Sequence, residues 1–112
     1  MGYLHIENLY RPGAQRVLLF KQVYVLEKIH GTSAHIVWSA ISGIRYFSGG
    51  ERHEQFVSLF PEDMSDRVKS IGQPEIVVYG EVYGGKCQGM SATYGKELRF
   101  IVFDVRVGAH WL

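Results

Sequence analysis

Apolar and polar positions alternate along several short stretches of the chain, and this pattern predicts strands. β-Branched and aromatic residues dominate 17–27, 34–39 and 44–47, which favours extended structure in each stretch. Glycine-containing segments at 30–32 and 42–43 separate the stretches and are typical of turns. We therefore expect three antiparallel strands around Lys28.

The middle of the chain has a helical pattern instead. Residues 51–60 and 61–71 fit two helices. In the second, Met64, Val68 and Ile71 recur on one helical face, and a glycine follows the last turn. The residues before position 17 are polar and broken by turn formers, so an irregular lead-in is predicted there.

The last third of the chain returns to strand patterns. Strands are expected at 75–83 and 98–107. The stretch 84–95 between them contains four glycines and is either an ordered binding loop or a mobile one. Together these elements predict an α+β domain with a largely antiparallel sheet and a helical insertion in its middle.

Composition and charge narrow the class of protein. A chain of 112 residues with 46% hydrophobic residues and a net charge of +1 fits one globular domain without broad attraction to polyanions. The single Cys87 excludes an internal disulfide framework and a cysteine-rich zinc site. No apolar run approaches the roughly 20 residues that span a bilayer, and the first residues lack a signal-peptide pattern. We expect a cytoplasmic protein without membrane contact.

One motif carries candidate chemistry. In Glu27-Lys28-Ile29-His30-Gly31-Thr32 an amine stands just before a glycine turn. Judged by residue type alone, the amine is a solvated and inert lysine at a strand end. The segment matches Lys-x-x-Gly of the covalent nucleotidyltransferases, and its full string resembles ATP-dependent RNA ligases of the phage RNA-repair type. Later segments match in the same order, at 44–50, 79–85 and 100–105.

The resemblance implies the N-terminal part of a nucleotidyltransferase, or adenylation, domain. Lys28 is then the nucleophile that attacks the α-phosphate of ATP, releases pyrophosphate and forms lysyl-AMP. The AMP passes to an RNA 5′-phosphate, and a 3′-hydroxyl displaces it. ATP, Mg²⁺ and RNA ends are therefore the implied cofactors and partners. An unperturbed lysine amine is protonated at pH 7, so this chemistry requires burial, nearby cations or a metal on the phosphates.

The resemblance also assigns nucleotide-binding roles. Glu27 and Ile29 flank the nucleophile and help to seat the base. Arg45 lies near the sugar and phosphate, where a guanidinium donates in a fixed fork. Glu81 accepts a hydrogen bond from the ribose, and Phe103 stacks on adenine. The alternatives are an arginine paired with a surface carboxylate, a solvated glutamate and a core aromatic residue.

Two further residues belong to the candidate site by position. His30 either shapes the phosphate pocket or is a plain turn residue, and Ser33 follows the motif directly. No histidine spacing fits a metal ligand set, so no metal-ligating residues are expected in the chain. Four basic residues, Lys86, Lys96, Arg99 and Arg106, form either an RNA-backbone strip or ordinary solvated charges.

Two motifs implied by the resemblance are missing from residues 1–112. These are an acidic Glu-Gly motif that helps to bind metal and a later pair of lysines that contact the phosphates. We therefore expect a single, incomplete domain, from a truncation or a natural fragment, that is weak or inactive alone. A non-catalytic nucleotide- or RNA-binding module with the same fold is the alternative function. Self-association through an exposed sheet edge is a further expectation.

Overall fold

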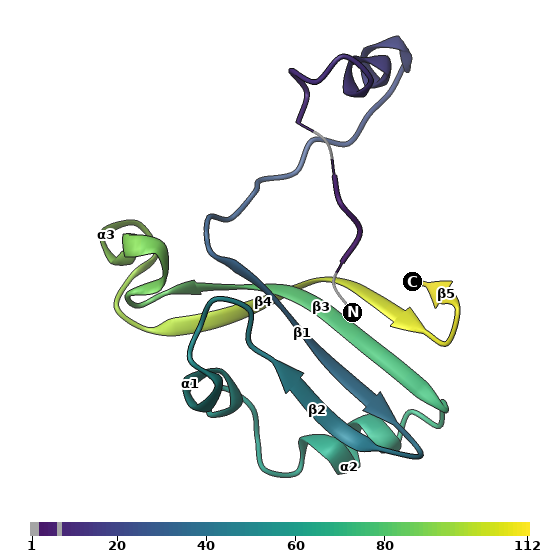
Figure 1. Ribbon diagram of the computed structural model, residues 1–112, viewed down its shortest axis with the longest axis vertical. Helices are drawn as coiled ribbons and strands as arrows, with labels where there is room; N and C mark the ends of the chain where they lie inside the picture. Colours follow the sequence, from purple (N-terminus) through teal and green to yellow (C-terminus); the bar gives the residue numbers. More distant parts are fainter. Residues whose placement is uncertain (1–2, 7) are drawn as a thin grey trace.

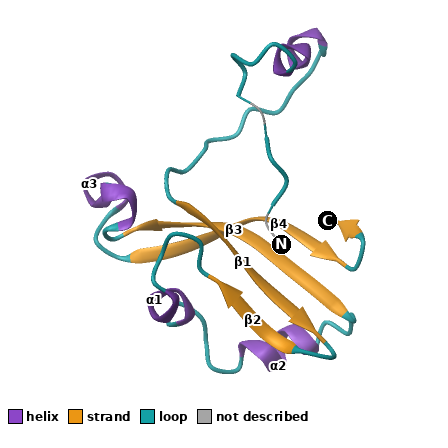
Figure 2. Ribbon diagram, in the orientation of Figure 1, coloured by secondary structure: helices purple, strands orange, loops and turns teal. Residues whose placement is uncertain are grey.

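A five-stranded sheet forms the centre of the molecule (Figures 1 and 2). The computed structural model describes residues 3–6 and 8–112. All neighbouring strands in the order β2-β1-β3-β4-β5 are antiparallel. The strands are β1 (Thr32–Ser39), β2 (Gly43–Phe47), β3 (Glu75–Gly84), β4 (Leu98–Val107) and β5 (His110–Trp111). The helical elements are η1 (Ala14–Leu19), α1 (His53–Val57), α2 (Met64–Lys69), η2 (Cys87–Gly89) and α3 (Ser91–Tyr94).

The predicted α+β class and the antiparallel sheet with its helical insertion are confirmed. The expected strands at 34–39, 44–47, 75–83 and 98–107 are all present within one or two residues of their predicted ends. The two helices of the insertion are present but shorter than predicted, with five and six residues.

The side chains of strand β1 alternate between the two faces of the sheet. Its alternate residues Ala34, Ile36 and Trp38 are buried and belong to the clusters that include residues of α1 and α2. Ser33 and His35 point the other way, because successive side chains of a strand face opposite sides. One face of the sheet is therefore covered by α1 and α2, and we call the other the helix-free face.

The core under the helices is built around Phe56 of α1. Its side chain is fully buried and packs with Ala34, Ile36 and Val82. Edge-to-face ring contacts join it to Phe60 and Phe100 at centroid distances of 5.1 and 5.4 Å. This cluster joins the helical insertion to four strands, β1 to β4, so α1 is held by packing despite its short length.

A β-bulge divides strand β4. Tyr79 pairs with Asp104 and Gly80 pairs with Val102, so Phe103 is an extra residue without a partner in β3. A side chain at position 80 would overlap the ring of Phe100 and the carbonyl of residue 101. Glycine is therefore required where the two strands change register.

The strand prediction for 17–27 is wrong. Residues 14–19 form the 3-10 helix η1, and no strand is assigned between it and β1. Residues 14–27, which we call the arm, project away from the sheet (Figure 1). The Cα radius of gyration of the chain is accordingly 16.2 Å, against about 13 Å for a compact chain of this length. The apolar side chains are exposed, with Tyr24 at 99%. The arm therefore has strand propensity but pairs with none of the five strands.

The expected arrangement around Lys28 changes accordingly. Lys28 lies in the irregular segment that leads into β1, not at the end of a strand.

The 84–95 stretch is ordered in part as η2 and α3. Within the described residues, no helix is long and apolar enough to cross a membrane.

Removal of the Phe56 ring tests this packing. We expect Phe56→Ala to lower the free energy of unfolding by about 3–5 kcal/mol, because it leaves a cavity between α1 and the sheet. Urea denaturation followed by circular dichroism measures the change. Phe20→Ala is the matched control, since Phe20 is 69% exposed. Equal losses for the two variants would contradict the assignment of the core to α1.

Candidate functional site

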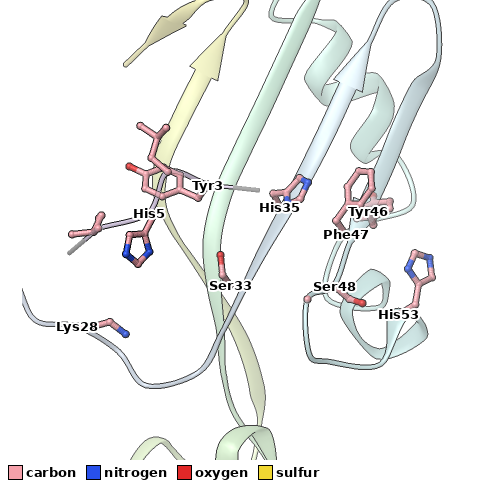
Figure 3. A pocket seen from close by; sticks show the side chains of 12 residues that line it. Tyr3, His5, Lys28, Ser33, His35, Tyr46, Phe47, Ser48 and His53 are labelled. Atoms are coloured by element: carbon pink, nitrogen blue, oxygen red, sulfur yellow. The ribbon is translucent and has the colours of Figure 1, made fainter. Parts of the chain in front are cut away.

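An open cavity of about 960 Å³ lies where three parts of the chain meet. Residues 3–6 and Lys28 form one side, Ser33 and His35 of β1 form the floor, and the end of β2 with α1 forms the other side (Figure 3). Its volume is within the range of small-molecule sites. The residues that line it are Tyr3, Leu4, His5, Ile6, Lys28, Ser33, His35, Tyr46, Phe47, Ser48, Gly49 and His53.

The lining combines cationic, hydroxyl and aromatic groups. Lys28 contributes an amine, Ser33 and Ser48 contribute hydroxyls, and three imidazoles come from separate parts of the chain. The described residues of the lining include no carboxylate. Groups of this kind bind anions by hydrogen bonding and charge, while the aromatic rings supply surface for a planar group.

Gly31 fixes the segment of Lys28 on the sheet. A Cβ at this position would overlap the carbonyl oxygen of Val82 and would lie 3.2 Å from the Cγ of Glu81. The backbone of the motif therefore rests directly on β3, beside the Glu81 side chain. The glycine of the Lys-x-x-Gly pattern is required here by a close approach of two backbones.

A second glycine segment closes on the same place. Gly49 has a φ of +62°, and a side chain there would overlap the carbonyl oxygen of Ser33. The backbone N–H of Gly50 donates a 2.9 Å hydrogen bond to Oγ1 of Thr32. The segment after Arg45 and the segment after Lys28 thus pack against each other, although nearly 20 residues separate them.

The glycine-rich stretch after β3 also reaches the motif. The backbone N–H of His30 donates a 3.0 Å hydrogen bond to the hydroxyl of Tyr94 in α3. The Tyr94 ring in turn packs edge-to-face against Tyr83 at 5.5 Å. This stretch is therefore held against the Lys28 segment, which matches the ordered alternative of the two predicted for it.

The candidate residues divide into two groups. Lys28 and Ser33 line the cavity, whereas Glu27, Ile29, His30, Arg45, Glu81 and Phe103 are not part of its lining. Glu81 is half-buried. It lies next to the cavity, because it pairs in register with Ser33. The Cζ of Arg45 lies 5.9 Å from the ring centroid of Phe47, which does line the cavity. Phe103 is half-exposed at the bulge and contacts Tyr3.

Several lining residues were not expected from the sequence. Residues 3–6 were predicted as irregular lead-in, and no local pattern shows that they return to the sheet. His35 had a detectable signal, because it is two positions from Ser33 and strand alternation places both on one face. Ser48 and Gly49 belong to the matching segment 44–50, in which the resemblance assigns a role to Arg45 alone.

His35 is an unusual group within the cavity. Its ring stacks on Phe47 with a centroid distance of 4.4 Å and an interplanar angle of 11°. Its Nε2 atom is buried without a hydrogen-bond partner among the described residues. Burial lowers the pKa of His35 below the ordinary value, because desolvation disfavours the charged imidazolium.

The described residues contain no group of three or more His, Cys, Asp or Glu side chains placed to hold a metal ion. Comparison with protein-family models, curated proteins and solved structures finds no match for the chain.

Replacement of Gly31 tests the backbone contact under the motif. We expect Gly31→Ala to lower the free energy of unfolding by about 1–3 kcal/mol, because the added methyl group overlaps the Val82 carbonyl. Thermal and urea denaturation provide the measurement. Gly13→Ala is the control, since a Cβ there meets no atom within 4 Å. A neutral Gly31→Ala variant would show that the motif does not rest on β3.

The pH dependence of stability tests the burial of His35. Its pKa is lowered in the folded state, so the unfolded chain binds more protons and stability is lost as pH falls below about 6.5. We expect the free energy of unfolding to fall between about pH 7.5 and about pH 5, and His35→Phe to reduce that fall. His110→Phe on the exposed β5 is the control. If the free energy of unfolding of His35→Phe depended on pH as it does in the wild type, His35 would not contribute to that dependence.

Proposed function

We propose that the chain forms part of the adenylation domain of an ATP-dependent RNA ligase, with Lys28 as the nucleophile. The observation that carries the proposal is that three of the matching segments pack against one another beside the cavity that Lys28 lines. The Lys28 segment, the glycines after Arg45 and the strand of Glu81 belong to different parts of the sequence, and they meet within direct packing distance.

The cavity supplies part of the chemistry that this reaction needs, namely an amine and two hydroxyls. In the proposed step, the neutral amine Nζ of Lys28 forms a bond with the α-phosphorus of ATP and releases a proton to solvent, while the bond from that phosphorus to pyrophosphate breaks. The hydroxyls of Ser33 and Ser48 are donors for phosphate oxygens. Glu81 lies beside Gly31, and in this proposal its carboxylate accepts a hydrogen bond from the ribose.

The residues present also fit ATP with its metal. The cavity has room for a nucleotide, and aromatic surface is available from Phe47. Mg²⁺ would neutralise phosphate charge and stabilise the leaving group when bound with ATP. The protein groups then have the tasks of orienting the nucleotide and presenting the amine. In the later steps, an RNA 5′-phosphate and 3′-hydroxyl would be the partners.

A non-catalytic nucleotide- or RNA-binding module is the second candidate. It is favoured by the surroundings of Lys28, which is exposed and has no hydrogen bond or ion pair with any of the residues described in the structure. An amine that nothing orients is a poor nucleophile. The same cavity would still bind a nucleotide through its hydroxyls and rings.

Incubation with labelled ATP and Mg²⁺ tests the proposal. We expect a slow, acid-labile adduct that adds the mass of one AMP to Lys28 and is lost in Lys28→Ala. Lys21→Ala is the matched control, because Lys21 lies on the exposed arm away from the cavity. Peptide mass spectrometry identifies the modified residue, and thermal shift with ATP reports binding independently.

Two outcomes would contradict the catalytic proposal. An adduct of equal yield in Lys28→Ala would exclude Lys28 as the nucleophile. Stabilisation by ATP without any adduct, in the wild type and in Lys21→Ala, would favour the non-catalytic module instead.

A further inference from the structure

Tyr3 occupies an aromatic site on the helix-free face of the sheet. Its ring lies 5.1 Å from Tyr79, 4.9 Å from Phe103 and 5.5 Å from Trp111, centroid to centroid. The interplanar angles are 66°, 85° and 83°, so all three contacts are edge-to-face. Three strands contribute one ring each to this site, and a residue from the start of the chain fills it.

A hydrogen bond completes the site. The Tyr3 hydroxyl donates to Oδ2 of Asp104 at 2.6 Å, while the backbone N–H of Val105 donates to Oδ1 of the same carboxylate at 2.9 Å. The carboxylate is therefore oriented by the backbone and presents one oxygen to the ring in the site. This hydrogen bond, together with burial, raises the pKa of Tyr3.

The chemistry of the site is not restricted to tyrosine. The three aromatic side chains can contact any planar ring, and the oriented carboxylate accepts a hydrogen bond from a donor group at the edge of that ring. Adenine has both features, since it is planar and carries an exocyclic amine. Tyr79 is only 1% exposed with Tyr3 in place, so a ring that replaced Tyr3 would also keep this apolar surface away from water.

The site adjoins the cavity of Lys28. Residues 3–6, which we call the N-terminal strap, line that cavity opposite His53 and Ser48 (Figure 3). Tyr3 of the strap touches Phe103, to which the resemblance assigns stacking on adenine. The strap thus connects the cavity to the aromatic site.

We propose that the site of Tyr79, Phe103, Trp111 and Asp104 is a base-binding site, and that Tyr3 and the adenine of a nucleotide compete for it. This inference rests on the proposed function for its ligand. In the free protein the strap is closed and Tyr3 fills the site. Binding of the base displaces the ring, so the apparent affinity is the intrinsic affinity multiplied by the fraction of protein in which the site is open.

Adenosine binding to strap variants tests the competition. Adenosine is the probe because it carries the base without phosphates and cannot react with Lys28. We expect Tyr3→Ala to bind adenosine about tenfold more tightly than the wild type, because the competing ring is gone. Tyr3→Phe keeps the ring and loses the hydrogen bond to Asp104, so its affinity should lie between the two. Tyr10→Ala is the matched control, since Tyr10 is exposed and its hydroxyl accepts a hydrogen bond from Asn8.

Tryptophan emission and isothermal calorimetry provide the two readouts. Trp111 belongs to the site, whereas Trp38 is buried among residues of the helix-covered face. Quenching of emission by adenosine should disappear in Trp111→Phe and persist in Trp38→Phe. Circular dichroism and a urea melt establish that each variant is folded.

The outcomes separate this inference from the proposed function. Equal or weaker adenosine binding by Tyr3→Ala than by the wild type, or no binding by any variant, would overturn the competition. That result can coexist with a Lys28 adduct, in which case the ligase proposal stands alone. Tighter binding by Tyr3→Ala without a Lys28 adduct would instead support the base site and contradict the catalytic proposal.

Discussion

Pairing of β1 on both of its edges is the constraint on which the rest of the structure depends. Strand β1 lies between β2 and β3, and it pairs with β3 from Thr32 to Ser39 and with β2 from His35 to Ser39. The register fixes the pleat, so Ala34 and Ile36 must face the helices while Ser33 and His35 face the cavity. A slip by one residue would place the polar residues in the core. The position of the cavity floor therefore follows from the same pairing that builds the sheet.

The exposed arm pairs with neither edge of this sheet. Strand β2 has a free outer edge, and β5 covers only Arg106 and Val107 of β4, so backbone groups that could pair with another strand remain free. The apolar residues of the arm lie in solvent, although their composition is that of a strand. Strand propensity and strand pairing are separate, and here only the first is present.

The fold could be predicted from the sequence wherever pattern and pairing agree. Strands β1 to β4 and both insertion helices have clear periodicity and glycine boundaries, so their positions are recognisable in one dimension. The candidate site was accessible only in part. Lys28 and Ser33 were identified from a local motif, whereas Tyr3 and His53 join the cavity through contacts between distant segments. No local periodicity encodes such contacts, because they depend on the three-dimensional path of the chain.

The β-bulge in β4 has a consequence for how this strand uses its two faces. Before the bulge, Leu98 and Phe100 pack on the core beneath the helices, and after it Val105 and Val107 do so. The two pairs differ in parity, so one extra residue is needed between them to keep all four on the same side. The extra residue is Phe103. The change of register that keeps the core continuous therefore also leaves Phe103 without a partner in β3. This residue lies where the strand passes the aromatic site.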